Sequence, residues 1–359
     1  MLTKYKIAHL KNLYIFFVIL SLIIFFFSTT KVNAKGFDIN NIEISEPFEI
    51  NFNKNKVIDN GFKKGFLKLI SVIVSTNDQK KIVEPRINEI KRMIDSFSIK
   101  EEKFVDEIYY VNLGVSFNKK KVFSYLEKKN IFPSIPLKKK ILFIPIIIDE
   151  KKKDLLLFSN NKIFDEWNNQ IKDFHLIEYI LPSEDLEDLN LLRKNYEIIE
   201  QYDFQDITNK YNLSDSIVAL IFKNENIIRT LSRISIQNNL ILKNQSFEGK
   251  DIINDDNKKI IINDLKIIYE DYWKSINQIN TSIKLYLSIK VNNSDSSKVS
   301  KFEKILSETD LIYDFNISKL DSKFVYYQII FNGTHNNFLK SMKEKNYNFN
   351  TQDKYWILK

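Results

Sequence analysis

Four acidic residues within five positions, at the start of a predicted helix, are the strongest candidates for chemistry in this sequence. They follow a predicted buried strand, and loops at the carboxyl ends of parallel strands are where α/β sheets bind ligands. Two carboxylates about 5–10 Å apart can carry out glycosidase chemistry. Carboxylates in the first turn of a helix also stabilise it through the helix dipole. We expect a helix to begin at Pro182-Ser183 and interpret the string as helix capping, with an envelope hydrolase as the alternative. The four residues are Glu184, Asp185, Glu187 and Asp188.

Other catalytic and metal-binding patterns are missing from the sequence. Beyond residue 34 the only histidines are His175 and His335, which fall in different predicted domains. The chain has no cysteine, and its 6 glycines form neither a G-x-G nor a P-loop pattern. The acidic turn around Asp255 lacks the spacing of a calcium loop. We therefore expect no catalytic residue, no metal site and no cofactor.

The lysine content does not indicate a nucleic-acid partner. The formal net charge is +8, but residues 1–34 hold four lysines and no acidic residue, so the remainder carries +4. Three lysine runs, at 119–121, 138–140 and 151–153, lie at the ends of predicted elements. Such runs could bind phosphate, but no basic stripe is interleaved with aromatic side chains. We interpret them as solvated ends and expect no nucleic-acid partner.

The first 34 residues have the pattern of a secretory signal peptide. A basic start precedes the apolar stretch 13–27, and Val32-Asn33-Ala34 is an acceptable cleavage site. Cleavage between Ala34 and Lys35 would release a periplasmic protein. The alternative is an uncleaved inner-membrane anchor through residues 13–27, although this stretch is shorter than the roughly 20 residues that span a bilayer.

Hydrophobic periodicity divides the remaining chain into three units. The first, 41–136, is predicted as α+β, in the order strand, two helices, two strands and helix. Its expected elements are a strand at 48–52, helices at 57–74 and 83–94, strands at 97–105 and 108–117, and a helix at 119–129 capped by Asn118.

The second unit, 138–280, alternates strands with short helices, which predicts a parallel sheet with helices on its faces. Its first strand, 141–148, is continuously apolar, and Pro145 within it suggests an edge or a bulge. The other expected strands are 177–181, 216–222, 227–236 and 240–247, the last two antiparallel, and a long helix is expected at 257–280.

The third unit, 281–359, has the ferredoxin-like order βαββαβ. Its expected elements are strands at 283–291, 311–317, 324–331 and 355–358, with helices from 295 or 296 to 306 and at 336–345. The predicted fold is therefore α+β, a central α/β sandwich flanked by two small ferredoxin-like βαββα(β) units.

The ordered segments resemble a family of secreted bacterial proteins of unknown function, number two thousand and sixty-six in the domain-of-unknown-function series. The resemblance covers about residues 42–358, and its most specific carriers are the Leu-Pro-x-x-Asp-Leu-Glu-Asp string at 181–188 and the terminal segment 355–358. The middle unit is similar, at fold level only, to the N-terminal domains of TolB-type and curli-secretion-type envelope proteins. The resemblance implies an exported envelope protein and supplies no catalytic residue. We predict a periplasmic binding or scaffold protein whose partners are unidentified envelope proteins.

Overall fold

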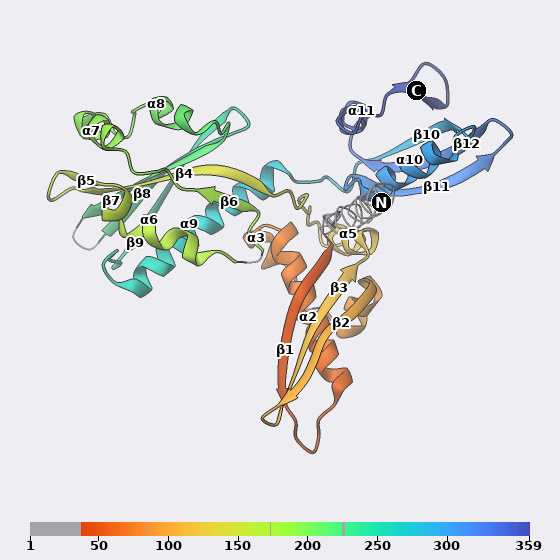
Figure 1. Ribbon diagram of the computed structural model, residues 1–359, viewed down its shortest axis with the longest axis horizontal. Helices are drawn as coiled ribbons and strands as arrows, with labels where there is room; N and C mark the ends of the chain where they lie inside the picture. The colour runs from red at the N-terminus through yellow and green to blue at the C-terminus, as the bar shows by residue number, and fades with distance from the viewer. Residues whose placement is uncertain (1–36, 84, 173, 225–226) are drawn as a thin grey trace, which may run out of the picture. The chain divides into compact units, whose positions relative to one another are not determined.

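The computed structural model describes residues 37–359 except Glu84, Asp173, Glu225 and Asn226 (Figure 1). The predicted leader and its cleavage site at Ala34 therefore lie outside the described residues. The described chain contains helices and three separate β-sheets, which confirms the α+β class. None of the helices in this part of the chain has both the length and the apolar character needed to cross a membrane.

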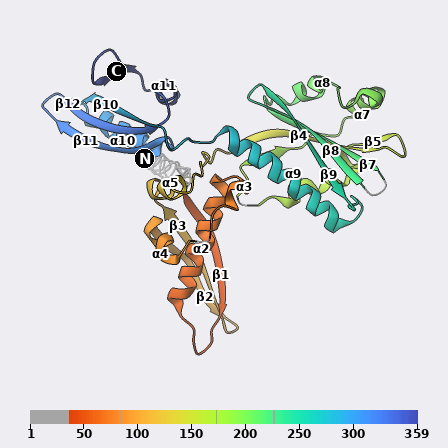
Figure 2. The same ribbon diagram turned by 180° about the vertical axis from the view of Figure 1, so that it is seen from behind.

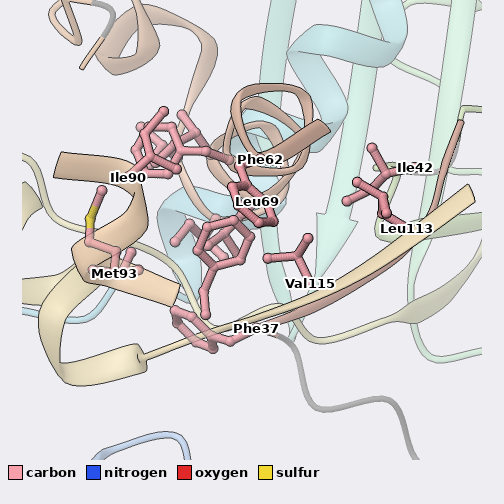
Figure 3. Close-up of a cluster of buried hydrophobic side chains, with 14 of the residues drawn as sticks. Phe37, Ile42, Phe62, Leu69, Ile90, Met93, Leu113 and Val115 are labelled. Atoms are coloured by element: carbon pink, nitrogen blue, oxygen red, sulfur yellow. The ribbon is translucent and has the colours of Figure 1, made fainter. Parts of the chain in front are cut away.

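A three-stranded antiparallel sheet and the helices packed on one face of it form the N-terminal part. The elements are β1 (Asp38–Pro47), α2 (Lys54–Ile73), α3 (Thr76–Gln79), α4 (Ile87–Met93), β2 (Ile94–Val105), β3 (Ile108–Phe117) and α5 (Lys119–Glu127). The strand order is β1-β3-β2. Figure 3 shows Phe62 and Leu69 of α2 against Leu113 and Val115 of β3, within one buried cluster. The alternate residues of β3 therefore face the helices, as the period-two pattern predicts.

Two glycines one turn apart allow α2 to lie close to the sheet. A Cβ atom at Gly61 would overlap the Leu113 side chain, and one at Gly65 would lie 2.7 Å from Cδ1 of Ile42. Both positions are in the helix interior, where glycine costs about 1 kcal/mol relative to alanine. Close helix–sheet packing explains why the helix contains them.

The strand predicted at 48–52 is wrong, because the first strand ends at Pro47. The backbone N–H of Phe48 still donates to the Glu107 carbonyl at 2.8 Å, but the chain then turns away from the sheet. The Phe48 and Phe52 rings pack on each other with centroids 4.7 Å apart. Their alternation reflects an aromatic loop at the end of the sheet rather than a strand.

The second predicted helix of this unit is shorter than 83–94. It begins at Ile87, after Arg86, whose backbone N–H donates to the Glu89 carboxylate at 2.9 Å. It ends at Met93, where the chain passes directly into β2.

The central sheet has six strands and a layer of helices on each face. Its elements are β4 (Lys139–Asp149), β5 (Asp154–Leu156), α6 (Lys162–Trp167), β6 (Ile177–Ile180), α7 (Leu186–Lys194), α8 (Gln205–Thr208), β7 (Ser216–Asn224), β8 (Ile227–Ile236), β9 (Asn239–Glu248) and α9 (Asp255–Ile276). The order is β5-β4-β7-β8-β9, with β6 also paired to β4. Strands β6 and β7 run parallel to β4, and β8 and β9 continue the sheet antiparallel. These directions agree with the sequence prediction.

Successive residues of β4 enter two different cores. Ile141 and Phe143 pack in the cluster that contains Trp167 and residues of α9, whereas Leu142 and Ile144 pack with residues of α7 and α8. Figure 2 shows α9 along one face of this sheet. A strand covered on both faces must be apolar throughout, which accounts for the continuous run.

Pro145 lies in the middle of β4, at a local gap in its pairing. On one side of β4, β6 pairs with residues 139–142 and β5 with residues 147–149. The side chain of Asn161 fills the gap: its Nδ2 donates to the Pro145 carbonyl at 2.9 Å, and its Oδ1 accepts from the Ile163 N–H at the start of α6. Pro145 thus lies where β4 lacks a strand partner on one side, although β4 is an inner strand of the sheet.

The C-terminal part is a five-stranded sheet with two helices. Its elements are β10 (Lys284–Asn292), α10 (Ser296–Glu308), β11 (Ile312–Leu320), β12 (Phe324–Asn332), α11 (His335–Lys343), β13 (Phe349–Asn350) and β14 (Trp356–Leu358). The strand order is β11-β12-β10-β14-β13. Strand β14 runs parallel to β10, and the two-residue β13, which the sequence did not predict, runs antiparallel to β14.

Candidate binding site on the N-terminal sheet

The acidic string after β6 lies at a helix start, but the helix begins later than predicted. Its first residue is Leu186, not Pro182 or Ser183, because Asp185 is the N-cap. The Asp185 carboxylate accepts from the N–H groups of Glu187 at 2.8 Å and Asp188 at 3.4 Å. The first turn therefore contains Glu187 and Asp188 and not Glu184 and Asp185.

The same carboxylates are tied to other parts of the central domain. Lys210 donates to Asp185 at 2.8 Å and to Asp188 at 2.6 Å, and only 3% of the Asp188 side chain is exposed. The bond from Lys210 is the main cause that lowers the pKa of Asp185. The Glu184 carboxylate accepts from the Ser159 N–H at 3.2 Å. These contacts account for three of the four carboxylates as cap, ion pair and loop contact.

The two histidines belong to different parts of the fold, His175 to the central part and His335 to the C-terminal part. His175 lies just before β6, and its Nδ1 accepts from the Lys172 N–H at 3.3 Å. Burial lowers the pKa of His175 to about 4. His335 is the first residue of α11, where its ring lies beside Trp356. Among the described residues, no three His, Asp or Glu side chains are grouped as a metal site would require.

Three charged side chains are buried along one face of α9, at a spacing of four residues. Lys266 donates to the Trp167 carbonyl at 2.7 Å, and Lys274 to the Ser71 carbonyl at 2.6 Å. Glu270 accepts from the first N–H groups of the β6 segment, those of Leu176 and Ile177, at 2.9 and 3.0 Å. Each charge therefore satisfies backbone groups of another element, so we interpret the row as structural.

Among the described residues, a group on the N-terminal sheet best resembles a ligand site. It lies on the face of the sheet opposite to the buried core and the helices. Two adjacent cross-strand rows meet there: Glu43, Asn112 and Glu101 in one, and Ser45, Tyr110 and Lys103 in the next. They line a hollow of about 390 Å³. We call it the polar hollow, and its side chains are those of Glu43, Ser45, Lys64, Glu101, Lys103, Tyr110 and Asn112.

Asn112 lies at the centre of the polar hollow, on the middle strand. Its Oδ1 is buried and has no hydrogen-bond partner within the described chain. Its neighbours across the sheet are the carboxylate-bearing Glu43 and Glu101. A buried amide oxygen costs free energy when it is left unpaired, so this atom is a ready acceptor for a ligand.

Lysines border the polar hollow. Lys103 donates to Glu101 at 3.3 Å, and its Nζ lies 5.7 Å from the centre of the Tyr110 ring. Lys64 reaches from α2 to the Glu43 carbonyl at 2.7 Å. The two lysines offset the two carboxylates in charge, so the lining as a whole is close to neutral.

A bulge in β1 turns Glu43 toward the polar hollow. Ile39 pairs with Val115 and Ile42 with Leu113, so β1 has one residue more than β3 between these pairs. Side chains alternate between the two faces along a regular strand. The bulge breaks this alternation, so the residues after it point to the face opposite to the one that an unbroken alternation from Ile39 would give them. If β1 were paired regularly from Ile39 onward, Glu43 would lie opposite Val111 and point toward α2.

A second bulge, in β2, does the same for Glu101. Ile99 pairs with Leu113 on the helix-covered face, but Glu101, two residues later, pairs with Asn112 on the outer face. The next residue, Glu102, points back toward the helices, where it bonds Lys54 at 2.6 Å. Both carboxylates of the polar hollow thus depend on an irregularity in an edge strand.

Sequence reasoning missed the polar hollow because its residues come from three separated segments. Alternating polar residues on a strand are typical of any solvated sheet face. A bulge leaves only a weak trace, a change in the phase of apolar residues between Ile99 and Phe104. That phase change was the available signal.

Comparisons with known proteins add little. No family model matches the chain, and no curated protein matches it. A crystal structure described as that of an uncharacterized protein is similar over 40% of this chain and 95% of that chain, with 8% sequence identity and a TM-score of 0.17. A similarity this weak carries no argument about fold or function. The resemblance to the secreted family of unknown function therefore stays a prediction.

Proposed function

We propose that this chain is an exported cell-envelope protein that acts by binding another molecule and not by catalysis. The observation that carries the proposal is the polar hollow, where groups from three strands converge around a buried, unpaired amide oxygen. Concave sites with a few convergent polar groups are the usual places where proteins bind ligands.

The contacts of the acidic string support binding over hydrolysis. A glycosidase needs two carboxylates that face one substrate cavity. Here Asp185 and Asp188 share one lysine, and Asp185 also caps a helix. Neither carboxylate lines the polar hollow.

Export is the second part of the proposal. It is supported by the leader pattern of residues 1–34, and it predicts a mature chain that begins at Lys35 in the periplasm. In that case the membrane is contacted only if residues 13–27 stay attached. The proposed partners are envelope molecules, with no role for nucleic acid.

We also propose that the flanking units are variants of the ferredoxin-like arrangement. The C-terminal order β11-β12-β10-β14, with one helix before β11 and one after β12, supports this for the third unit. Strand β14 departs from the arrangement, because it runs parallel to β10 where the ferredoxin-like sheet is antiparallel. The N-terminal order β1-β3-β2 supports it for the first unit without a fourth strand. Within the described residues, β1, β2 and β11 each pair with one strand only, so a partner strand could join the other side of each.

Site-specific photo-cross-linking in living cells tests the binding function. The full chain with its own leader carries p-benzoylphenylalanine in place of Ser45, which is exposed and lines the polar hollow. The control places the same group at Asn244, an exposed residue of β9. We expect an adduct from position 45 and not from position 244, on a chain whose first residue is Lys35 by mass spectrometry.

Two results would overturn the proposal. The absence of any adduct at position 45 would remove the evidence for a bound molecule. A full-length chain in the cytosol that retains Met1 would remove the envelope assignment.

A further inference from the structure

We infer that the polar hollow binds an uncharged saccharide, an inference that rests on the proposed binding function. The first reason is charge. Its two carboxylates, Glu43 and Glu101, are matched in number by Lys64 and Lys103, so the lining carries no net charge that would favour a cation or an anion. A neutral ligand with many hydrogen-bonding groups fits such a lining better than an ion.

The second reason is the mixture of donors and acceptors. Sugar hydroxyl groups both donate and accept, so they can pair with groups of either kind. Carboxylates only accept, ammonium groups only donate, and an amide does both. The row Glu43–Asn112–Glu101 therefore offers acceptors on both sides of an amide, with the donor of Lys103 in the next row.

The third reason is the position of the unsatisfied groups. Among the described residues, none bonds the side-chain carboxylate of Glu43, and none bonds Oδ1 of Asn112. Tyr110 lies next to Asn112 on the same face and lines the hollow. Aromatic rings contact the apolar C–H faces of sugar rings, so the hollow presents a surface for the ring as well as for its hydroxyl groups.

Its size agrees with this class of ligand. The volume of about 390 Å³ falls within the range of roughly 300–1,000 Å³ that small-molecule sites occupy. It lies on an open sheet face, so a longer glycan could extend beyond it along the strands.

Isothermal titration calorimetry at 0.15 M salt tests the inference with the mature chain purified from cell envelopes. The neutral probes are cellotetraose, maltotetraose and tetra-N-acetylchitotetraose. Spermidine serves as the cationic probe and tetragalacturonic acid as the anionic probe. We expect one neutral oligosaccharide to bind and neither charged probe to compete.

Three substitutions locate the binding. Asn112→Ala removes the central amide and should weaken binding at least tenfold. Glu43→Gln and Glu101→Gln keep side-chain size and should weaken it about threefold to tenfold. Glu43 is exposed and outside the core, so Glu43→Gln keeps the test informative if Asn112→Ala folds poorly. Asn244→Ala, on the exposed strand β9, should leave the Kd unchanged.

The inference is overturned if no neutral oligosaccharide binds, if a charged probe binds in its place, or if the three substitutions leave the Kd unaltered. Cross-linking at position 45 separates these failures from failure of the proposed function. An adduct with a protein would retain the binding function and reject the saccharide, whereas no adduct and no saccharide binding would reject both.

Discussion

Nδ2 of Asn161 lies 2.9 Å from the carbonyl oxygen of Pro145, deep in the central sheet. Asn161 is fully buried, and its Oδ1 caps α6 by accepting from Ile163 and Phe164. One side chain thus replaces a missing strand partner and also starts a helix. The central sheet can therefore contain a proline without an exposed edge.

Replacing Asn161 by alanine should destabilise the protein by about 2–4 kcal/mol, because it removes an N-cap and leaves a buried carbonyl unpaired. Urea unfolding followed by circular dichroism measures this loss. Asn254→Ala is the matched control, since Asn254 caps α9 in an exposed position and should cost about 1 kcal/mol or less. Equal losses for the two variants would contradict the role of Asn161 in the sheet.

Gly61→Ala should destabilise the chain although alanine favours helices. The propensity gain is about 1 kcal/mol, but the new methyl group would overlap Leu113 beneath α2, and overpacking costs about 1–3 kcal/mol. In a Leu113→Ala background the same substitution should be neutral or stabilising. A double-mutant cycle from chemical unfolding measures the coupling, and a coupling near zero would show that the helix does not need this glycine.

Lys266 should give the protein a stability that increases with pH in the alkaline range. Burial lowers its pKa to about 8 in the folded state, from the ordinary 10.5. Between these values the unfolded chain binds more protons, so the free energy of unfolding increases with pH, by roughly 3 kcal/mol over the full range. Unfolding curves of the wild type and Lys266→Met between pH 7 and 10.5 measure the difference. The wild type should gain relative to the variant, and parallel pH dependences would contradict the burial of a charged lysine.

Replacing the acidic string by amides should affect stability and not binding. The variant Glu184→Gln/Asp185→Asn/Glu187→Gln/Asp188→Asn loses both ion pairs of Lys210, whose side chain is 41% exposed and can be solvated again. We expect a loss of about 1–2 kcal/mol and an unchanged cross-link at position 45. A folded variant that no longer forms the cross-link would assign these carboxylates a part in function.

Most elements of the fold could be predicted from the sequence, because buried faces impose periodicity. Strand β4 was recognised from its apolar run and α5 from its cap, Asn118. The first strand was misplaced because Phe48 and Phe52 imitate alternation in an aromatic loop. The two-residue β13 is too short to carry a pattern.

The polar hollow could not be predicted, for a different reason. Its geometry depends on the register between strands, and the register is set by contacts between distant residues such as Ile42 and Leu113. The acidic string, in contrast, was visible because its four members lie within five positions of the sequence, 184–188. The acidic string was therefore easy to find in the sequence, although its contacts in the structure are those of a helix cap and ion pairs.

The residue that the bulge adds to β2, Lys100, can be lost without a change in the composition of this surface. With Lys100 deleted, Ile99 would still pair with Leu113, and regular alternation would place Glu101 opposite Asn112 on the outer face. The hairpin would keep its pairing and lose only the local twist that a bulge adds. Among related genes, the absence of this codon should therefore leave the ligand unchanged.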